Sequence, residues 1–273
     1  MTMLRGIGAV TSVECSKLAA QMKTRIVLAA CVAGPFVFAV AMRVQSNVPA
    51  DTLFGRSITE SGLAVPLVVL GFAALWVFPV VASVVGGDLF SSEDRYGTWA
   101  TLLTRSRTRA EVFAGKVVTA LGFSLLATVV LASSSMAAGL LVIGHQPLVN
   151  LSGVLLAPGP ALVRIATAWA SVLPSAIGLT ALAVLASVAT RSSAAGIGLP
   201  VVGALTMQLY AMVDGPEVIR RSLITSGFGA WHGLLAEPSY YGPIGHAALA
   251  GMLYLVVCLT IAHHVLRHRD IGG

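Results

Sequence analysis

The sequence has few charged residues and lacks the common signatures of soluble enzymes. Only 10% of its 273 residues are charged, whereas soluble domains average about 25%. Its three cysteines, Cys15, Cys31 and Cys258, lie far apart and form no paired motif, so we expect neither a disulfide framework nor a cysteine metal site. The GxxxxGK[S/T], HExxH and GxSxG patterns are also missing, which argues against ATP binding through a P-loop and against zinc-protease or serine-hydrolase chemistry.

Apolar residues dominate instead, at 56% of the chain with a mean hydropathy of +0.88. Six runs without a charged residue are long enough to cross about 30 Å of hydrocarbon as helices. They cover residues 26–42, 61–87, 117–144, 165–190, 192–213 and 243–266. No run contains Asp or Glu, which argues against a proton-coupled carrier. We therefore predict a single all-α polytopic membrane domain over 1–273 with six transmembrane helices and a kink at Pro174.

The distribution of basic residues predicts the orientation of these helices. If both termini are cytoplasmic, the inner segments hold 12 Lys and Arg residues and the outer loops hold 5. This positive-inside bias favours an N-in, C-in topology. It also explains the net charge of +6 as membrane anchoring, so we expect contact with lipids and not with nucleic acid.

Two segments outside the spans have helical patterns. Residues 1–25 start too polar for a cleavable signal peptide and predict a cytoplasmic helix at the membrane surface. Its apolar side would consist of Val10, Val13, Leu18 and Met22, with Glu14 and Lys17 intruding on it. Residues 214–242 predict a short re-entrant helix before the sixth span, or else an ordinary extracellular loop. The pattern there consists of Val218, Ile219, Leu223 and Ile224, with Arg220 and Arg221 between them.

The longest charged stretch is residues 88–116, DLFSSEDRYGTWATLLTRSRTRAEVFAGK, which holds nine of the 28 charged residues. Such a segment cannot lie in hydrocarbon, so it predicts a cytoplasmic connector between the second and third spans. Gly97 permits a sharp reversal of the chain, and Thr98 can cap a short helix over 99–103. We expect Glu93 to form a salt bridge with a neighbouring helix, although a solvated carboxylate is the alternative.

Several residues of this connector carry a family resemblance. Glu93, Gly97-Thr98, Leu102-Leu103, Arg109 and Gly115-Lys116 fall at a spacing that resembles type-2 ABC-transporter permeases. The basic ending over 265–270, which contains an aspartate, is similar to that family's ending after the sixth span. The chain departs from the pattern at Ser106, where the family usually has proline, so the resemblance does not imply a proline-induced break in the helix there.

The resemblance implies a transport function for a chain that is not itself an enzyme. It implies the membrane subunit of an exporter in the cytoplasmic membrane of a bacterium. Two copies of a cytosolic ABC subunit would bind ATP and Mg, and a second copy of this chain or a related permease would complete the pathway. No cofactor is expected in this chain. The apolar spans favour an amphipathic or lipid-like substrate, drug or peptide.

Two sets of candidate site residues follow. The expected interface with the ATPase consists of Glu93, Arg95, Gly97, Thr98, Trp99, Leu102, Leu103, Arg105, Arg107, Arg109 and Lys116. The arginines can bind carboxylates of an acidic partner, or they can contact lipid phosphates and enforce topology. The candidate pathway lining consists of Ser124, Thr128, Ser134, Ser135, Thr206 and Gln208, with helix–helix packing as the alternative role.

A different class of function is also open. His263, His264 and His268 lie near the inner end of the last predicted span. A non-transport membrane anchor could bind haem or quinone through these histidines, and a Soret band in the purified protein would reveal a haem.

Overall fold

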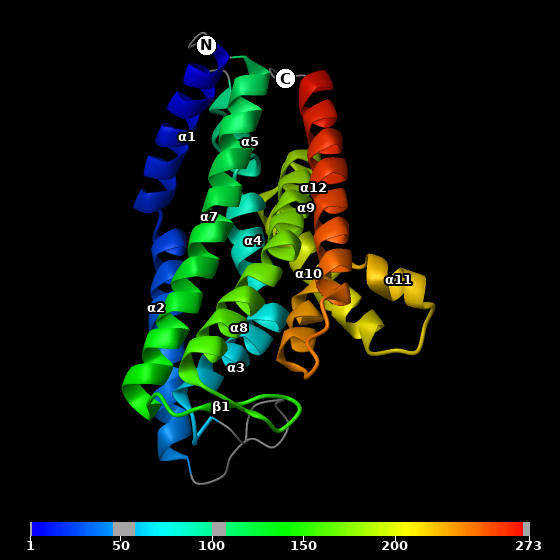
Figure 1. The fold of residues 1–273 in the computed structure, drawn as a ribbon. Helices are drawn as coiled ribbons and strands as arrows, with labels where there is room; N and C mark the ends of the chain where they lie inside the picture. Colours follow the sequence, from blue (N-terminus) through cyan, green and yellow to red (C-terminus); the bar gives the residue numbers. More distant parts are fainter. Residues whose placement is uncertain (1, 46–57, 100–107, 270–273) are drawn as a thin grey trace.

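A computed structural model describes residues 2–45, 58–99 and 108–269 as an elongated bundle of helices (Figure 1). Six helices in these ranges are long and apolar enough to cross a membrane. They are Met22–Val44, Gly62–Gly86, Arg109–Ile143, Pro158–Thr190, Ser193–Ala211 and Gly242–His268. Each overlaps one predicted run, which confirms an all-α polytopic membrane protein with six spans. The N-terminal end of the first helix and the C-terminal end of the last helix lie at the same end of the bundle (Figure 1).

The elements follow one another along the chain with few long connections. They are α1 (Thr2–Ala20), α2 (Met22–Val44), η2 (Gly62–Ala64), α3 (Val65–Phe72), η3 (Ala73–Val77), α4 (Phe78–Gly86), α5 (Ser91–Tyr96), α7 (Arg109–Ala138), η4 (Gly139–Ile143), β1 (Leu148–Val149), β2 (Leu155–Leu156), α8 (Pro158–Ser171), α9 (Leu173–Thr190), α10 (Ser193–Ala211), α11 (Glu217–Ser222), η5 (Ile224–Leu235) and α12 (Gly242–His268). The second span is built from η2, α3, η3 and α4, where η3 is a π-helical turn.

The third span begins eight residues before its apolar run because α7 has a capping box. The Thr108 hydroxyl accepts a hydrogen bond from the Glu111 backbone N–H at 3.2 Å, and the Glu111 carboxylate accepts one from the Thr108 N–H at 3.0 Å. Such a box satisfies two N–H groups that a helix start leaves unpaired. Charged residues are tolerated in this first part of α7 if it lies outside the hydrocarbon, which hydropathy alone does not predict.

The fourth span is interrupted where the sequence predicts its kink. Helix α8 ends at Ser171 and α9 begins at Leu173, with Pro174 in the first turn of α9. Farther along, α9 packs closely on α12 through two glycines, Gly178 and Gly251. A Cβ atom on Gly251 would lie 2.3 Å from the carbonyl oxygen of Pro174, so only glycine permits this approach of the two backbones.

The connection between the third and fourth predicted spans, residues 145–164, contains regular secondary structure. Its first part forms a small antiparallel hairpin, in which Leu148 pairs with Leu156. The Asn150 side chain closes the turn by accepting the backbone N–H groups of Ser152 and Val154 at 2.9 and 2.8 Å. Its last part is already helical, because α8 starts at Pro158. Asn150 is a typical turn residue. The hairpin was nevertheless not predictable from the sequence, because strands of two residues are too short to show an alternation of apolar and polar side chains.

The two helical patterns outside the spans are also present as helices. Helix α1 lies along the first half of α7 (Figure 1), with Val10 and Leu18 buried but Val13 and Met22 exposed. Its predicted apolar side is therefore only half correct. Before the last span, α11 has no buried residue, whereas η5 packs against α8, α9, α10 and α12. The depth of these segments in the membrane stays a prediction.

Candidate functional site

A cluster of four charged residues, three of them buried and the fourth (Lys17) reaching in from the surface, joins three helices at the connector end of the bundle. The Lys116 ammonium on α7 is fully buried and donates to Glu14 on α1 at 3.0 Å, to Glu93 on α5 at 2.9 Å and to the Leu89 carbonyl at 2.9 Å. Lys17 donates to the same two carboxylates at 2.9 and 3.0 Å. Two acids and two bases compensate each other here, which buried charges require. Glu14, Lys17, Glu93 and Lys116 are called the buried cluster below.

The cluster keeps Glu93 and Lys17 charged at neutral pH. Burial by itself would raise the pKa of Glu93, but the Lys116 charge and hydrogen bonds from Thr98 and Lys116 hold it at about 2 instead of 4.5. Burial would likewise lower the pKa of Lys17, yet Glu14 and Glu93 raise it above its ordinary value. In both cases the ion pairs outweigh the cost of desolvation. The salt bridge predicted for Glu93 is therefore present.

A second ion pair ties the start of α2 to the end of the second span. Lys23 pairs with Asp88, and Arg95 lies 3.9 Å from the same carboxylate. Although burial would raise the pKa of Asp88, the hydrogen bond from Lys23 lowers it below its ordinary value. Arg95 is itself exposed and lies over the Tyr96 ring, 4.7 Å from its centroid. Its guanidinium is therefore accessible at the surface, as the interface prediction requires.

The chain reverses at Gly97 as predicted, but Trp99 does not lie at the surface as an interface residue would. Gly97 ends α5 in the left-handed region at φ +63°, and the Thr98 hydroxyl donates to Glu93. Trp99, which belongs to the expected interface with the ATPase, is instead buried at 5% exposure. Its ring stacks on Phe90 with centroids 6.3 Å apart, and its indole N–H donates to Asp94 at 3.1 Å. The Trp99 side chain is therefore covered within the chain.

Part of the predicted interface lies outside the described residues. This applies to Leu102, Leu103, Arg105 and Arg107, to Ser106 where the family's proline is missing, and to most of the predicted helix over 99–103.

Arg109 and the C-terminal ending meet at the connector. The Arg109 guanidinium donates to the carbonyl oxygens of Leu266, Arg267 and Arg269 at 3.3, 3.0 and 2.7 Å. Arg269 in turn pairs with Asp94 and lies 5.8 Å from the Trp99 ring centroid. A cation at the last carbonyls of a helix compensates its unpaired acceptors and dipole. The ending of α12 is thereby held against the connector, a role for Arg269 that the sequence analysis missed.

The three histidines at the end of α12 lie on different sides of it. His263 packs on Phe113 with ring centroids 5.1 Å apart, whereas His264 and His268 face each other at 4.2 Å. The described residues contain no group of three His, Cys, Asp or Glu side chains that could hold a metal ion. Among the described residues, no third ligand lies beside these histidines, so their surroundings do not favour the haem-binding alternative.

The six candidate pathway residues do not converge on one cavity. Ser124, Thr128, Ser134 and Ser135 are buried on α7, and each hydroxyl but that of Ser124 has a recorded backbone acceptor. Ser134, for example, donates to the Cys31 carbonyl on α2 at 2.6 Å. Thr206 is exposed and bonds only within its own helix. Ser134 thus contributes to the contact between α7 and α2, as the packing alternative expects, whereas Thr128, Ser135 and Thr206 bond to carbonyls of their own helices.

Gln208 has a more specific structural role. Its side-chain amide donates to the carbonyl oxygens of Ala74 and Leu75 at 3.3 and 3.2 Å. Pro79 has no N–H, so neither an α-helical nor a π-helical bond from that residue can satisfy these carbonyls. Gln208 on α10 supplies the missing donor and thereby ties the fifth span to the π turn of the second.

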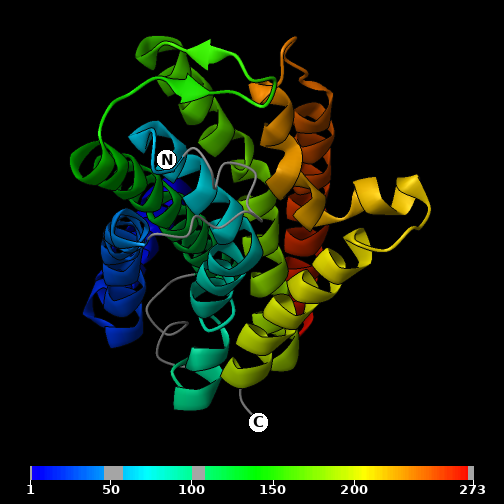
Figure 2. The ribbon, with the colours of Figure 1, turned by 90° about the horizontal axis from the view of Figure 1, so that it is seen from below.

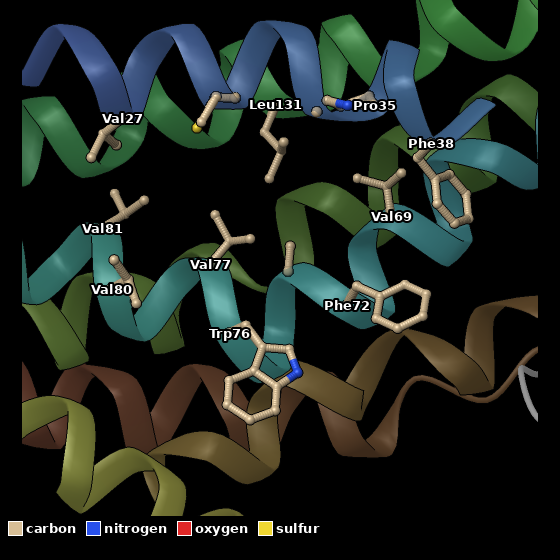
Figure 3. A pocket seen from close by; sticks show the side chains of 14 residues that line it. Val27, Pro35, Phe38, Val69, Phe72, Trp76, Val77, Val80, Val81 and Leu131 are labelled. Carbon is tan, nitrogen blue, oxygen red and sulfur yellow. The ribbon is translucent and has the colours of Figure 1, made fainter. Parts of the chain in front are cut away.

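Apolar grooves flank the second span on two sides. One groove of about 420 Å³ lies between α2 and the second span, with Leu131 of α7 at its floor (Figure 3). Phe38 and Phe72 meet edge to face there, with centroids 6.1 Å apart. A second groove of about 740 Å³ lies between η3, α10 and η5 and includes Gln208. Trp76 borders both grooves. Such surfaces suit an apolar ligand better than an ion.

Six apolar helices with a charged connector held at one end define a multi-pass membrane protein. The model of the family described as "ABC-2 family transporter protein" matches residues 11–207, which is more than half of the chain. The chain therefore belongs to the ABC-2 transporter family and is a membrane permease component of an ABC transporter. The matched range includes the buried cluster and the connector but ends before α11 and α12. A search of curated proteins found no match.

Proposed function

We propose that this chain is the membrane subunit of an ATP-driven exporter in the cytoplasmic membrane of a bacterium. In this proposal, two cytosolic ATP-binding subunits bind ATP and Mg and contact the connector of residues 88–116. A second copy of the chain, or a related permease, completes the pathway. The substrate class is an amphipathic or lipid-like molecule, drug or peptide, which is supported by the apolar grooves beside the second span.

The observation that carries the proposal is the buried cluster. Its members come from α1, α5 and α7, and Arg109 and Asp94 tie the end of α12 to the same region. A force applied to the exposed side of the connector would therefore reach four helices at once. Breaking any of these ion pairs by movement would leave a buried charge unpaired, which costs several kcal/mol. Moving these helices together, with the ion pairs intact, therefore requires less free energy than moving one of them alone.

Within this arrangement the predicted interface residues divide into two roles. Arg95 is exposed and available to a partner, and Arg105 and Arg107 are proposed to act with it on an acidic surface. Lys116 is fully buried and Arg109 is occupied by the carbonyls of α12. These two residues would support the interface from within and not touch the partner.

Co-purification and ATPase assays with the ATP-binding subunit test this proposal. We expect Arg105→Glu with Arg107→Glu to weaken co-purification and to lower ATP hydrolysis by the complex at least tenfold, because two attractive charges become repulsive. Arg109 is left intact so that α12 stays anchored. The matched control is Arg5→Glu with Arg25→Glu, the same charge change at exposed arginines of α1 and α2. Equal ATPase rates in both double variants would contradict a connector that contacts the ATPase.

A further inference from the structure

A polar recess lies between α11 and the start of α12, at the end of α12 remote from the C-terminus. Figures 1 and 2 show α11 projecting sideways from the bundle at this place. The recess has a volume of about 470 Å³, and its polar lining includes Glu217, Arg220 and Arg221 of α11 together with Tyr240 and His246. This volume is within the range of about 300–1,000 Å³ typical of ligand sites.

The recess carries one uncompensated positive charge. Arg221 pairs with Glu217, so the charges of these two residues cancel. Within the described part of the chain, the Arg220 guanidinium has no ion pair or hydrogen bond, although its residue is half-buried. His246 Nδ1 lies 2.9 Å from the Gly242 carbonyl oxygen, so its other ring nitrogen is left for a further partner. The planar fork of a guanidinium matches carboxylates and phosphates.

The surroundings of the recess are apolar and aromatic. Tyr240 and Tyr241 precede α12 and are 62% and 63% exposed, and tyrosines of this kind favour the level of lipid head groups. Met212 after α10, Val218 on α11 and Leu249 on α12 are 84%, 81% and 73% exposed. The cationic recess suits the anionic head group of an amphiphile, and the exposed apolar side chains around it suit the amphiphile's apolar chain.

We propose that this recess binds the anionic head group of an amphiphile, with Arg220 as the residue that pairs with the anion. Tyr240 and His246 add hydrogen bonds to the head group, and the apolar chain lies along the exposed sides of α10 and α12. The site takes this chemistry whether the amphiphile is a membrane lipid or a transported molecule. The proposal does not depend on ATP or on an ATPase partner, so its failure would leave the proposed function untouched.

Lipid binding to the purified chain, without ATP or any partner, tests the site. Protein in a neutral detergent is titrated with phosphatidylglycerol or phosphatidylcholine, and retained lipid is counted by native mass spectrometry. We expect the wild-type chain to bind phosphatidylglycerol about tenfold more tightly than phosphatidylcholine, as one charge-assisted contact requires. Arg220→Gln should abolish this preference, and Arg220→Lys should keep part of it because the point charge remains.

Two further arms make the outcome decisive. The control Arg164→Gln removes an arginine of α8 that pairs with Glu237 at 3.2 Å outside the recess, and it should retain the wild-type preference. If glycerol phosphate displaces phosphatidylglycerol from the wild-type chain but not from Arg220→Gln, the head group alone is recognised. Absence of such competition, with lipid preference intact, would show that the apolar chain is needed. The proposal is refuted if the wild-type chain shows no preference, or if Arg220→Gln keeps it.

Discussion

Replacing Lys116 with methionine is the sharpest perturbation of the buried cluster. The change keeps the length of the side chain but leaves the carboxylates of Glu14 and Glu93 with Lys17 as their only shared ammonium. Removing one partner of a buried ion pair costs about 3–5 kcal/mol. Part of this cost falls on Glu93, because the Lys116 charge is the main interaction that holds its pKa at about 2 instead of 4.5.

The dependence on pH distinguishes this mechanism from a simple loss of packing. In the wild-type chain the pKa of Glu93 is lowered, so its contribution is fully present above its ordinary 4.5 and is lost as pH falls toward about 2. In Lys116→Met two carboxylates share one ammonium, which raises the pKa of one of them. A carboxyl with a raised pKa destabilises the fold at neutral pH, so this variant should become more stable as pH falls from 7 to 5.

Thermal unfolding in detergent between pH 7 and 3 measures both effects. We expect Lys116→Met to melt about 6–15 °C below the wild-type chain at pH 7 and to recover part of this difference at pH 5. Adding Glu14→Gln should restore stability, since Glu93 and Lys17 then form a neutral pair. Arg25→Met, at an exposed arginine, is the control. A Lys116→Met variant that melts within 2 °C of the wild type, or is destabilised equally at every pH, would refute the reasoning.

Two other substitutions test close contacts between spans, both by melting temperature in the same detergent. Gly251→Ala should lower stability by about 1–3 kcal/mol, because its Cβ would meet Pro174, whereas Gly245→Ala on the same helix has no atom within 4 Å and should be neutral or slightly stabilising. Equal effects would argue against the close α9–α12 crossing. Gln208→Leu should cost about 1–3 kcal/mol by removing the side-chain donor to the Ala74 and Leu75 carbonyls of η3. The control Thr206→Val loses only a bond within its own helix, and a loss of the same size there would remove the special role of Gln208.

The spans were predictable because hydrocarbon imposes a length and a composition that few other structures share. The break at Pro174 and the reversal at Gly97 followed from the backbone chemistry of those two residues. The salt bridge of Glu93 was predicted as a type of contact, but its partners were not. Each of these correct predictions depends on the chemistry of one residue or of residues close together in the sequence.

The failures concern contacts between distant parts of the chain. Glu14 seemed to spoil an amphipathic helix, yet it faces Lys116, which is 102 residues away. Trp99 was expected at an interface, and part of what covers it is Arg269 from the far end of the chain, which also pairs with Asp94. Gln208 resembled a polar group in a pathway, whereas in the structure it donates to two carbonyls of the π turn in the second span. No spacing rule connects such residues in a single sequence.

The length of the third span has a mechanical consequence. Helix α7 and its continuation η4 comprise 35 residues, or about 50 Å at 1.5 Å per residue, whereas hydrocarbon is only about 30 Å thick. Its far end is fastened where the Gly62 N–H donates to the Gly144 carbonyl at 3.1 Å, and its near end holds Lys116. The helix is therefore about 20 Å longer than the hydrocarbon is thick. Lys116 lies about two turns from the N-terminal end of α7, and its ion pairs join that end to α1 and α5, so we expect a displacement of the connector to tilt the whole helix.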